Sequence, residues 1–562
     1  MMKVLIVGGV AGGASAATRL RRLDEEAEII LFEKGPYVSY ANCGLPYYIG
    51  GTIAERSSLL VTSPALLEKR FRIDVRTGSE VTAIDRQKKE VTVRTAEKTY
   101  TESYDKLILS PGASPRRPAW EGMNLPGIFT IRNVPDTCAV DDYIREKGAK
   151  QAVVVGGGFI GVEMAENLKE RGLSVTLVEY LPQVLPPLDA EMAAIVQKTL
   201  RSHGITLRLG EAVEGFEPTE EGLRVKIRDR EGIDADLVIL SIGVQPDSRL
   251  AEDAGLKLGI GKSIAVNERY QTSDPDIYAV GDAISVQNRL SGQETLLPLA
   301  GPANRQGRAV AESVLGRTPS HKPIVQGSSV LKVFEITAAS TGLNEKQLKA
   351  AEMPYHKTYV HPASHAGYYP GGKPMSLKLL FASDGKVLGA QCVGEEGVDK
   401  RIDVIAAVIR LGGSVYDLED LELCYAPPYS SAKDPVNMAG FTAANILRGD
   451  MKVFYCEEIA GLNLENVTLL DVRTPQEYAL GSIPGAINIP VDELRNRLDE
   501  IPKEKPVYEF CMVGLRGHIA SRILSQHGYD VWNLSGGYKT YAAAKELYEA
   551  PSPTDCIGMP KK

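Results

Sequence analysis

Residues 153–161 read Val-Val-Val-Gly-Gly-Gly-Phe-Ile-Gly, and this stretch decides the fold. An apolar strand leads into Gly156, Gly158 and Gly161 at the spacing G-x-G-x-x-G, and the next apolar strand ends at Glu179. Glycines at this spacing let a pyrophosphate reach the amino end of the following helix, and the acidic residue binds the hydroxyls of a ribose. The stretch therefore predicts a Rossmann-like dinucleotide-binding domain.

The residues around Glu179 select between the two nicotinamide cofactors. A carboxylate at this position repels a 2′-phosphate, and the following Tyr180-Leu181-Pro182-Gln183 offers no basic residue to bind one. NADH is therefore favoured over NADPH.

A second, less regular unit of the same kind opens the chain. Its outer glycines are kept, but Val10 stands where the middle glycine belongs. Two nucleotide sites in one chain are typical of a flavin and a nicotinamide that exchange hydride, so we expect FAD at this first unit. The expected contacts of FAD are Gly8, Gly12, Gly13, Glu33 and, at the ribityl-phosphate end, Asp282.

The seven cysteines are dispersed and never paired as C-x-x-C, which argues against a disulfide framework and a zinc site. Cys43 stands out because it lies about ten residues after Glu33, where a thiolate can stack against the flavin. A helix start or positive neighbours there would lower the pKa of the thiol. With no partner cysteine four residues on, Cys43 must use a sulfenate or a mixed disulfide with an external thiol.

Composition excludes several classes of protein. The 562 residues predict roughly three to four domains, and a net charge of -8 argues against a nucleic-acid partner. No apolar run approaches the roughly 18 residues of a spanning helix, and no signal-peptide pattern precedes the first strand, so we expect a cytoplasmic protein without membrane insertion. His361 and His365 lack a third ligand, and no metal is expected.

Residues 1–448 resemble the FAD-dependent pyridine nucleotide–disulfide oxidoreductase family in the glycine motifs, the cysteine and a tyrosine segment near residue 425. Within its single-cysteine branch, residues 39–47 (Ser-Tyr-Ala-Asn-Cys-Gly-Leu-Pro-Tyr) are similar to the redox site of coenzyme A-disulfide reductases. The resemblance implies coenzyme A as a ligand or substrate, and arginine suits its phosphates. The ligands carried over are Ser15, Arg19, Arg22, Ser39 and Asn42.

The same resemblance implies a homodimer formed through residues 325–448. In that family two tyrosines of the partner subunit cover the substrate sulfur and supply a proton. Tyr425 and Tyr368 match these tyrosines, and Lys433 matches a further contribution from the second subunit. The loop around Tyr368 is one residue shorter than the family pattern.

A module over residues 466–550 resembles a rhodanese domain through Leu469 to Tyr478, Gly481 to Ala486 and Cys511 to Gly517. Cys511 follows a strand and precedes a helix, so we expect loop amides and Arg516 to converge on its sulfur as an anion cradle. The resemblance implies that this pocket holds a persulfide. Some related modules lack the cysteine and act as scaffolds, whereas Cys511 and Arg516 are both present here.

The expected fold class is α/β, with two Rossmann-like FAD- and NAD(P)-binding domains, an α+β dimerisation domain and a C-terminal α/β rhodanese domain. The expected boundaries are 1–112 and 256–324 for the FAD-binding domain, 113–255 for the NAD-binding domain with its connecting segment, 325–448 for the dimerisation domain, 449–465 for a linker, 466–550 for the rhodanese domain and 551–562 for a flexible tail.

The leading hypothesis is an FAD- and NADH-dependent reductase of sulfur–sulfur bonds in coenzyme A persulfide, polysulfide or coenzyme A disulfide. Electrons reach the substrate through Cys43, and Cys511 supplies sulfane sulfur. One alternative is an NADH oxidase or peroxidase that uses a Cys43 sulfenate, and the fused Cys511 module argues against it. A persulfide sensor or carrier is the other, and the intact nicotinamide motif argues against that. The sequence leaves the physiological sulfur substrate open.

Overall fold

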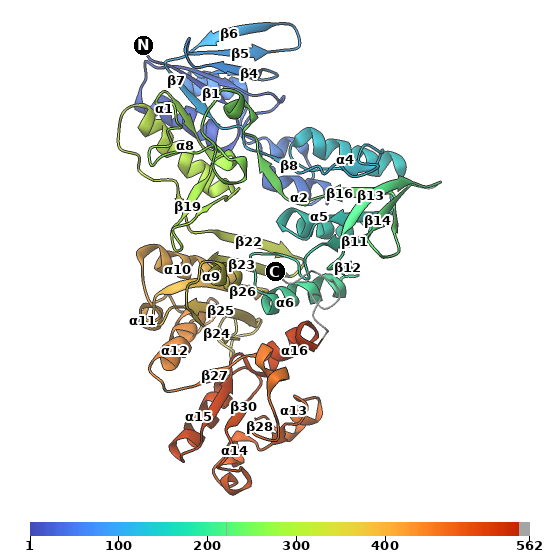
Figure 1. Ribbon diagram of the computed structural model, residues 1–562, viewed down its shortest axis with the longest axis vertical. Coiled ribbons are helices and arrows are strands. Elements are labelled where there is room, and N and C mark those ends of the chain that lie inside the picture. Colours follow the sequence, from blue (N-terminus) through green and yellow to red (C-terminus); the bar gives the residue numbers. More distant parts are fainter. Residues whose placement is uncertain (221, 550–562) are drawn as a thin grey trace, which may run out of the picture. The chain divides into compact units, whose positions relative to one another are not determined.

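The computed structural model describes residues 1–220 and 222–549, which form an α/β protein (Figure 1). The chain divides into two compact units. Unit 1 comprises residues 1–180 and 204–326, and unit 2 comprises residues 181–203 and the chain from 327 onward. The tail expected at 551–562 lies outside the described residues.

The first sheet of unit 1 is parallel throughout, with the strand order β18-β7-β1-β2-β3. Apart from the edge strand β3, its strands are short, mainly apolar runs because both faces are buried. Helix α1 packs closely on α8, and a Cβ at Gly307 would lie 2.3 Å from the carbonyl oxygen of Gly12. The bounds are β1 Lys3–Val7, α1 Ala11–Leu23, β2 Glu28–Phe32, β3 Asp74–Arg76, β7 Lys106–Leu109, β18 Ile277–Ala279 and α8 Ala300–Val314.

The second parallel sheet of unit 1 has the order β12-β11-β10-β16-β9 and carries the second glycine motif. Its elements are β9 Ile128–Phe129, α4 Val134–Lys147, β10 Gln151–Val155, α5 Phe159–Glu170, β11 Ser174–Glu179, β12 Thr206–Leu209 and β16 Leu237–Leu240. Small antiparallel pieces complete the unit: β4 Glu80–Asp85, β5 Glu90–Arg94, β6 Thr99–Ser103, β8 Ala113–Pro115, β13 Val213–Pro218, β14 Leu223–Ile227, β15 Ile233–Ala235, β17 Val244–Pro246, β19 Val286–Asn288, β20 Glu294–Thr295 and β21 Ile324–Val325, with β19 pairing in parallel to β21. Two further helices are α3 Pro64–Phe71 and α7 Arg249–Asp253.

Unit 2 begins with an antiparallel sheet of order β22-β23-β26-β25-β24. Every residue of β25 and β26 is buried, so both faces of the central strands are covered. The elements are α6 Ala190–Ser202, β22 Ser328–Val333, β23 Ile336–Gly342, α9 Glu345–Ala350, β24 His356–Val360, β25 Met375–Phe381, β26 Val387–Gly394, α10 Val398–Leu411, α11 Val415–Asp420 and α12 Pro435–Leu447.

The last part of unit 2 is a parallel sheet of order β27-β31-β30-β28-β29, drawn in orange and red in Figure 1. The segment expected as a linker, 449–465, contributes the edge strand β27 and the 3-10 helix η5, and Phe454 and Cys456 are buried in this core. The elements are β27 Val453–Phe454, η5 Cys456–Gly461, β28 Thr468–Asp471, α13 Pro475–Ala479, β29 Ile487–Asn488, α14 Val491–Leu494, β30 Val507–Phe510, α15 Leu515–Gln526, β31 Val531–Leu534 and α16 Gly537–Glu549.

A search of the helices in the described part of the chain finds none with the length and apolar character needed to cross a membrane.

Candidate active sites

The first glycine turn forms a cradle at the carboxyl edge of the first sheet. Gly8 has φ +98°, and a Cβ there would lie 2.1 Å from the carbonyl oxygen of Ser110, so the turn requires glycine. Val10 begins α1 without a side-chain cap. Glu33 accepts hydrogen bonds from the amides of Gly9 (2.9 Å) and Gly35 (2.8 Å). Helix amides that donate to a pyrophosphate and a carboxylate that accepts from ribose hydroxyls suit FAD.

Asp282 lies at the same edge, three residues after β18. Burial raises the pKa of its carboxyl group, and the charge of Arg132 opposes this shift. The structure thus brings together the residues expected to contact FAD from three segments of the chain, including Gly12, which packs against Ser110 and Val280.

The second glycine turn has the form that NADH requires. A Cβ at Gly161 would lie 1.9 Å from the carbonyl oxygen of Gly156, whereas a Cβ at Gly158 would meet no atom within 4 Å. The tight turn is possible because Gly161 has no Cβ. The open space at Gly158 leaves room for a pyrophosphate beside the start of α5. The carboxylate of Glu179 accepts a hydrogen bond from the amide of Gly157.

Cys43 lies between these two cradles. It sits in the 3-10 helix η1 (Asn42–Gly44), which runs into the short helix α2 (Leu45–Ile49). On one side, the amide of Ser39 donates to the carbonyl of Gly9 (2.8 Å) in the first glycine turn. On the other side, α2 packs against α5, and Arg171 donates to the carbonyl of Ile49 (2.8 Å). Cys43 itself is exposed and free.

The expected lowering of the pKa of Cys43 is wrong for the protein's own groups. Partial burial raises the pKa of the thiol, and the carboxylates of Glu163 and Asp282 raise it further. Glu163 reaches the thiol from α5, and it accepts a hydrogen bond from Tyr47. Burial and the neighbouring Glu166 raise the pKa of Glu163 to about 7.

Arg132 is a site residue that the sequence did not reveal. With the Asn42 amide oriented so that its oxygen faces this arginine, Arg132 Nη1 donates to that oxygen at 2.6 Å. Arg132 also lies close enough to Asp282 to lower the pKa of that carboxyl. It comes from the segment before α4, and no pattern in the sequence links that segment to Cys43.

The residues carried over as coenzyme A ligands do not form one cluster of free side chains. Arg19 pairs with Glu312 of α8 (2.9 Å), and Ser15 donates to Asn304 of the same helix (2.7 Å). Arg22 is exposed, and Ser39 has a left-handed backbone with φ +48°. Three of the five ligands, counting Asn42, therefore have side chains bonded inside unit 1, and Arg22 points to solvent.

Tyr368 and Tyr425 are brought together although 57 residues separate them in the sequence. Their hydroxyls lie 2.5 Å apart, both side chains are exposed, and the hydrogen bond raises the pKa of Tyr368. The buried Arg401 explains the alignment, because it donates to Ser364 O (2.9 Å) in one loop and Ser430 Oγ (3.2 Å) in the other. Lys433, which follows Tyr425 in the sequence, is exposed.

Cys511 is buried at the carboxyl end of β30. The amide of Gly514 donates to its Sγ at 3.1 Å, and the amides of Val513 and Gly517 also favour the thiolate. Burial nevertheless raises the pKa of the thiol, and the nearby Glu509 adds to the shift. Loop amides thus face the sulfur as expected.

Arg516 lies close enough to Cys511 for their charges to interact, and its guanidinium bonds a carboxylate. It forms a bidentate ion pair with Glu477 at 2.6 and 2.7 Å, and this pair lowers the pKa of Glu477 to about 2. Glu477 also accepts from the amide of Thr474 (3.0 Å), so it is fixed at the start of α13. The arginine therefore contributes its charge near Cys511 and is anchored by a carboxylate.

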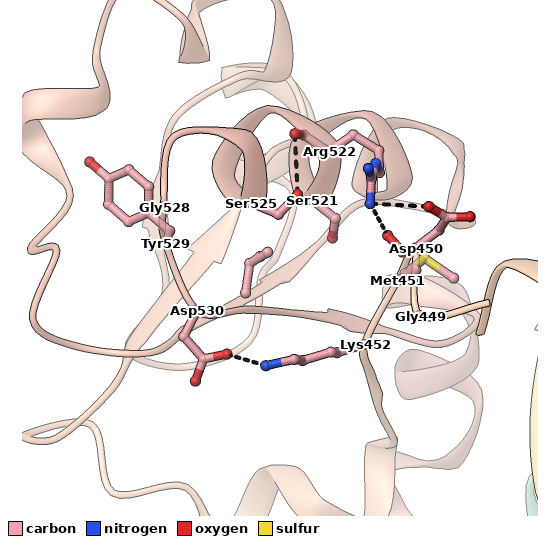
Figure 2. A pocket seen from close by; sticks show the side chains of 11 residues that line it. Gly449, Asp450, Met451, Lys452, Ser521, Arg522, Ser525, Gly528, Tyr529 and Asp530 are labelled. Carbon is pink, nitrogen blue, oxygen red and sulfur yellow. Dashed lines mark hydrogen bonds and ion pairs between the residues drawn. The ribbon is translucent and has the colours of Figure 1, made fainter. Parts of the chain in front are cut away.

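A pocket of about 400 Å³ opens elsewhere in the same module (Figure 2). It lies at the amino end of β31, whereas Cys511 follows the carboxyl end of the parallel β30, so it is not the sulfur site. Its charged residues pair with one another, Lys452 with Asp530 at 2.8 Å and Arg522 with Asp450 at 3.6 Å.

Three buried carboxylates of unit 2 lie close enough to hold a metal ion. The ammonium of Lys378 occupies the space among them: it lies 2.7 Å from Asp189 Oδ2 and also pairs with Glu191 and Glu345. Lysine therefore provides the positive charge that balances this cluster.

Three family models match the chain. Pyridine nucleotide-disulphide oxidoreductase matches residues 2–307, the dimerisation domain of the same group matches 328–435, and a rhodanese-like domain matches 457–544. Coenzyme A disulfide reductase of Staphylococcus epidermidis is 38% identical over 451 residues, covering 79% of this chain and 100% of that protein.

Two solved structures resemble nearly the whole chain. Reduced Bacillus anthracis CoADR-RHD has 51% identity and a TM-score of 0.95, covering 97% of this chain and 99% of that one. A NAD-dependent persulfide reductase from A. fulgidus has 37% identity and a TM-score of 0.90, covering 96% of this chain and 100% of that one.

Proposed function

The chain belongs to the pyridine nucleotide-disulphide oxidoreductase family, and from this premise we propose that it reduces sulfur–sulfur bonds at Cys43 with electrons from NADH and FAD. The observation that carries the proposal is the place of Cys43: an exposed single thiol lies between a cradle that suits FAD and a cradle that suits NADH. The similar proteins named for coenzyme A disulfide and for persulfide support a substrate with a sulfur–sulfur bond.

The first step is nucleophilic. The Cys43 thiolate attacks one sulfur of coenzyme A disulfide, the sulfur–sulfur bond breaks, and a mixed disulfide forms while one coenzyme A thiolate leaves. Gly8, Glu33 and Asp282 would hold FAD, which would supply the electron pair, taken from NADH, that reduces the mixed disulfide to two thiolates. Asn42, the neighbour of Cys43 in the sequence, is hydrogen-bonded to Arg132, and the two can bind a polar part of the substrate.

The tyrosine pair supplies the proton for the leaving sulfur. We infer a homodimer in which Tyr425 and Tyr368 of one subunit face Cys43 of the partner, because the pair is exposed on the domain that matches the dimerisation model. One tyrosine can donate its proton to the leaving sulfur. The short hydrogen bond between the two hydroxyls lets the other tyrosine stabilise the phenolate that results.

Cys511 collects sulfane sulfur in this proposal. Its thiolate takes the outer sulfur of a donor, the donor leaves as a thiolate or sulfite, and the loop amides stabilise the persulfide charge. The sulfur then passes toward Cys43, directly or as coenzyme A persulfide, and reduction releases hydrosulfide. A cytoplasmic location fits this scheme, because NADH is supplied there.

Steady-state NADH oxidation with coenzyme A persulfide, coenzyme A disulfide, polysulfide, peroxide and oxygen tests the proposal. We expect turnover on the sulfur substrates, with a loss of about a hundredfold or more in Cys43→Ser. The Cys511→Ser variant should lose turnover on polysulfide and keep turnover on coenzyme A disulfide. Faster turnover on peroxide or oxygen would instead indicate an oxidase or peroxidase, and no turnover on any would indicate a sensor.

A further inference from the structure

One short turn joins the Cys511 loop to strand β24 of the domain before it. On the side of β24, the amide of Tyr359 donates to Ser535 Oγ at 3.3 Å. One residue beyond β24, His361 Nε2 lies 3.1 Å from the carbonyl oxygen of Gly536 and 2.9 Å from Thr540 Oγ1. The turn of residues 535–537 is therefore held by β24 and by the residue next to it.

The start of helix α16, which directly follows this turn, holds the backbone of the Cys511 loop. The amide of Tyr538 donates to the carbonyl of Cys511 at 2.8 Å, and the amide of Lys539 donates to the carbonyl of Met512 at 3.0 Å. Gly537 has φ +60°, and a Cβ there would lie 2.5 Å from the carbonyl oxygen of Cys511. The turn and the loop are in direct contact, and a displacement of one must move the other.

The hydrogen bonds fix the state of His361. A carbonyl oxygen can only accept, so Nε2 must carry the proton that it donates to Gly536, and Nδ1 then accepts from Ser376 Oγ at 2.9 Å. The ring is neutral in this arrangement. Loss of solvent around it, followed by the charge of Lys539, lowers its pKa to about 3.

Side chains of strand β24 form hydrogen bonds and ion pairs that fix the strand. The buried Tyr359 donates through its hydroxyl to Glu191 Oε1 at 2.6 Å. Lys357 donates to Glu345 Oε1 at 3.0 Å and also pairs with Glu457 of η5. A Cβ at Gly536 would lie 2.9 Å from Cβ of Tyr359, so the turn sits directly on the strand.

We propose that His361 is a positioning residue for sulfur transfer at Cys511. It holds the 535–537 turn, and the turn sets the loop whose amides face the sulfur. This inference rests on the proposed function, because it assumes that Cys511 accepts sulfane sulfur. It also makes the loop geometry of the rhodanese-like module depend on a residue outside that module.

The test compares full-length His361→Ala and His361→Gln with the wild type, with thiosulfate as donor and cyanide as acceptor. Misplacing the loop should lower kcat for sulfur transfer about tenfold in His361→Ala, with a smaller change in KM for thiosulfate. Alkylation of Cys511 should also require a higher pH in His361→Ala, because weaker stabilisation of the thiolate by the loop amides raises the pKa of the thiol. His361→Gln keeps an N–H donor and should restore both properties toward the wild type.

Two further variants make the result decisive. Thr540→Val removes a hydroxyl contact of His361 from the other side of the turn and should repeat the His361→Ala effect in weaker form. His527→Ala removes a ring that bonds Ile523 O (2.8 Å) of its own helix and should change neither property.

Reduction of coenzyme A disulfide by Cys43 reports whether each variant is folded. Wild-type kcat and a wild-type alkylation profile in folded His361→Ala would overturn the inference while leaving the proposed function intact. No sulfur transfer by the wild type from thiosulfate or polysulfide would overturn the proposed role of Cys511 and, with it, this inference.

Discussion

At Cys43 the charged groups that act on the thiol are carboxylates. Glu163 and Asp282 both disfavour the thiolate, and the pKa of Glu163 is itself about 7. Near neutral pH, protonation of Glu163 therefore removes part of the negative field at the sulfur. After burial, this residue of α5 is the largest influence on how readily Cys43 ionises.

We expect Glu163→Gln to lower the pKa of the Cys43 thiol, because a neutral amide replaces a carboxylate. The measurement is the rate of Cys43 alkylation by iodoacetamide as a function of pH in a Cys511→Ser background. The profile should shift to lower pH. Glu170→Gln, an exposed change on the same helix, serves as the control and should leave the profile in place. An unshifted profile in Glu163→Gln would show that Glu163 does not act on the thiol.

Glu509 is a second carboxyl group beside a reactive sulfur. It is wholly buried, Ser521 donates to it at 2.7 Å, and burial raises its pKa well above the usual value. Because the folded state holds this proton more tightly, its contribution to stability is complete below the unfolded pKa and is lost as pH rises toward the folded pKa.

Glu509→Gln should therefore change the pH dependence of unfolding more than the stability near pH 5. An isosteric neutral amide keeps most of the hydrogen bonding, so we expect a loss within about 1 kcal/mol at pH 5. Between pH 5 and 9 the wild type should lose stability relative to the variant. Urea unfolding of both proteins across this pH range measures the difference. If the free energy of unfolding had the same pH dependence in both, Glu509 would not be neutral in the folded protein.

Single residues of the site differed in how far the sequence could reveal them. Cys43, Cys511 and the glycines could be found because their chemistry depends on local spacing. Glu163, Arg132 and Glu477 could not, since each reaches its partner from an element distant in the chain. The ion pair of Arg516 with Glu477 could not be predicted for the same reason, because Glu477 lies 39 residues away.

At the scale of elements, two loops of unit 2 are held in register by one buried cation. Arg401 on α10 bonds the loop before Tyr368 and the loop after Tyr425, and it pairs with the buried Asp434 at 3.0 Å. The alignment of the tyrosines thus depends on a residue that contacts neither ring.

Arg401→Met should uncouple the two loops. It leaves Asp434 buried without its ion pair, so we expect a loss of about 3–5 kcal/mol in the free energy of unfolding. The double variant Arg401→Met/Asp434→Asn should recover part of this stability and still show a reduced kcat, because the tyrosines are not realigned. Lys400→Met, an exposed neighbour, is the control. A double variant with wild-type kcat would show that Arg401 does not align the tyrosines.

The contact between β24 and the 535–537 turn should weaken in acid. The pKa of His361 is about 3 in the folded protein, below the usual value of 6.5, so the unfolded state binds more protons between these values. Stability should fall as pH drops from about 6.5 toward 3, by at most about 1.4 kcal/mol per unit from this group. In urea unfolding, the free energy of unfolding of His361→Gln should fall less steeply between pH 6.5 and 3 than that of the wild type. An unchanged slope would contradict a neutral His361.

Elements were predicted from the sequence where the pattern was local. The strands beside both glycine motifs and the strand before Cys511 have continuous apolar runs, and these runs identify buried parallel strands. Strand β27 was missed because it has two residues and pairs with β31 at a sheet edge, which gives no periodicity. Its place is decided by burial of Phe454 in the core of the module.

On the scale of the whole molecule, the chain combines two reactive thiols with distinct surroundings. Cys43 is exposed between two nucleotide cradles, whereas Cys511 is buried in a loop of amides. An exposed thiol suits a bulky disulfide, and a buried one in an anion cradle suits a small sulfane sulfur. Under the proposed function, the fused modules therefore divide sulfur collection from sulfur reduction.

The central claim is that Cys43 forms a mixed disulfide with its substrate. Mass spectrometry of the Cys511→Ser protein after exposure to coenzyme A disulfide, without NADH, tests it most directly. We expect one coenzyme A per chain, attached to Cys43 and released when NADH is added. An unmodified Cys43, or a Cys43 that carries only oxygen, would contradict the account.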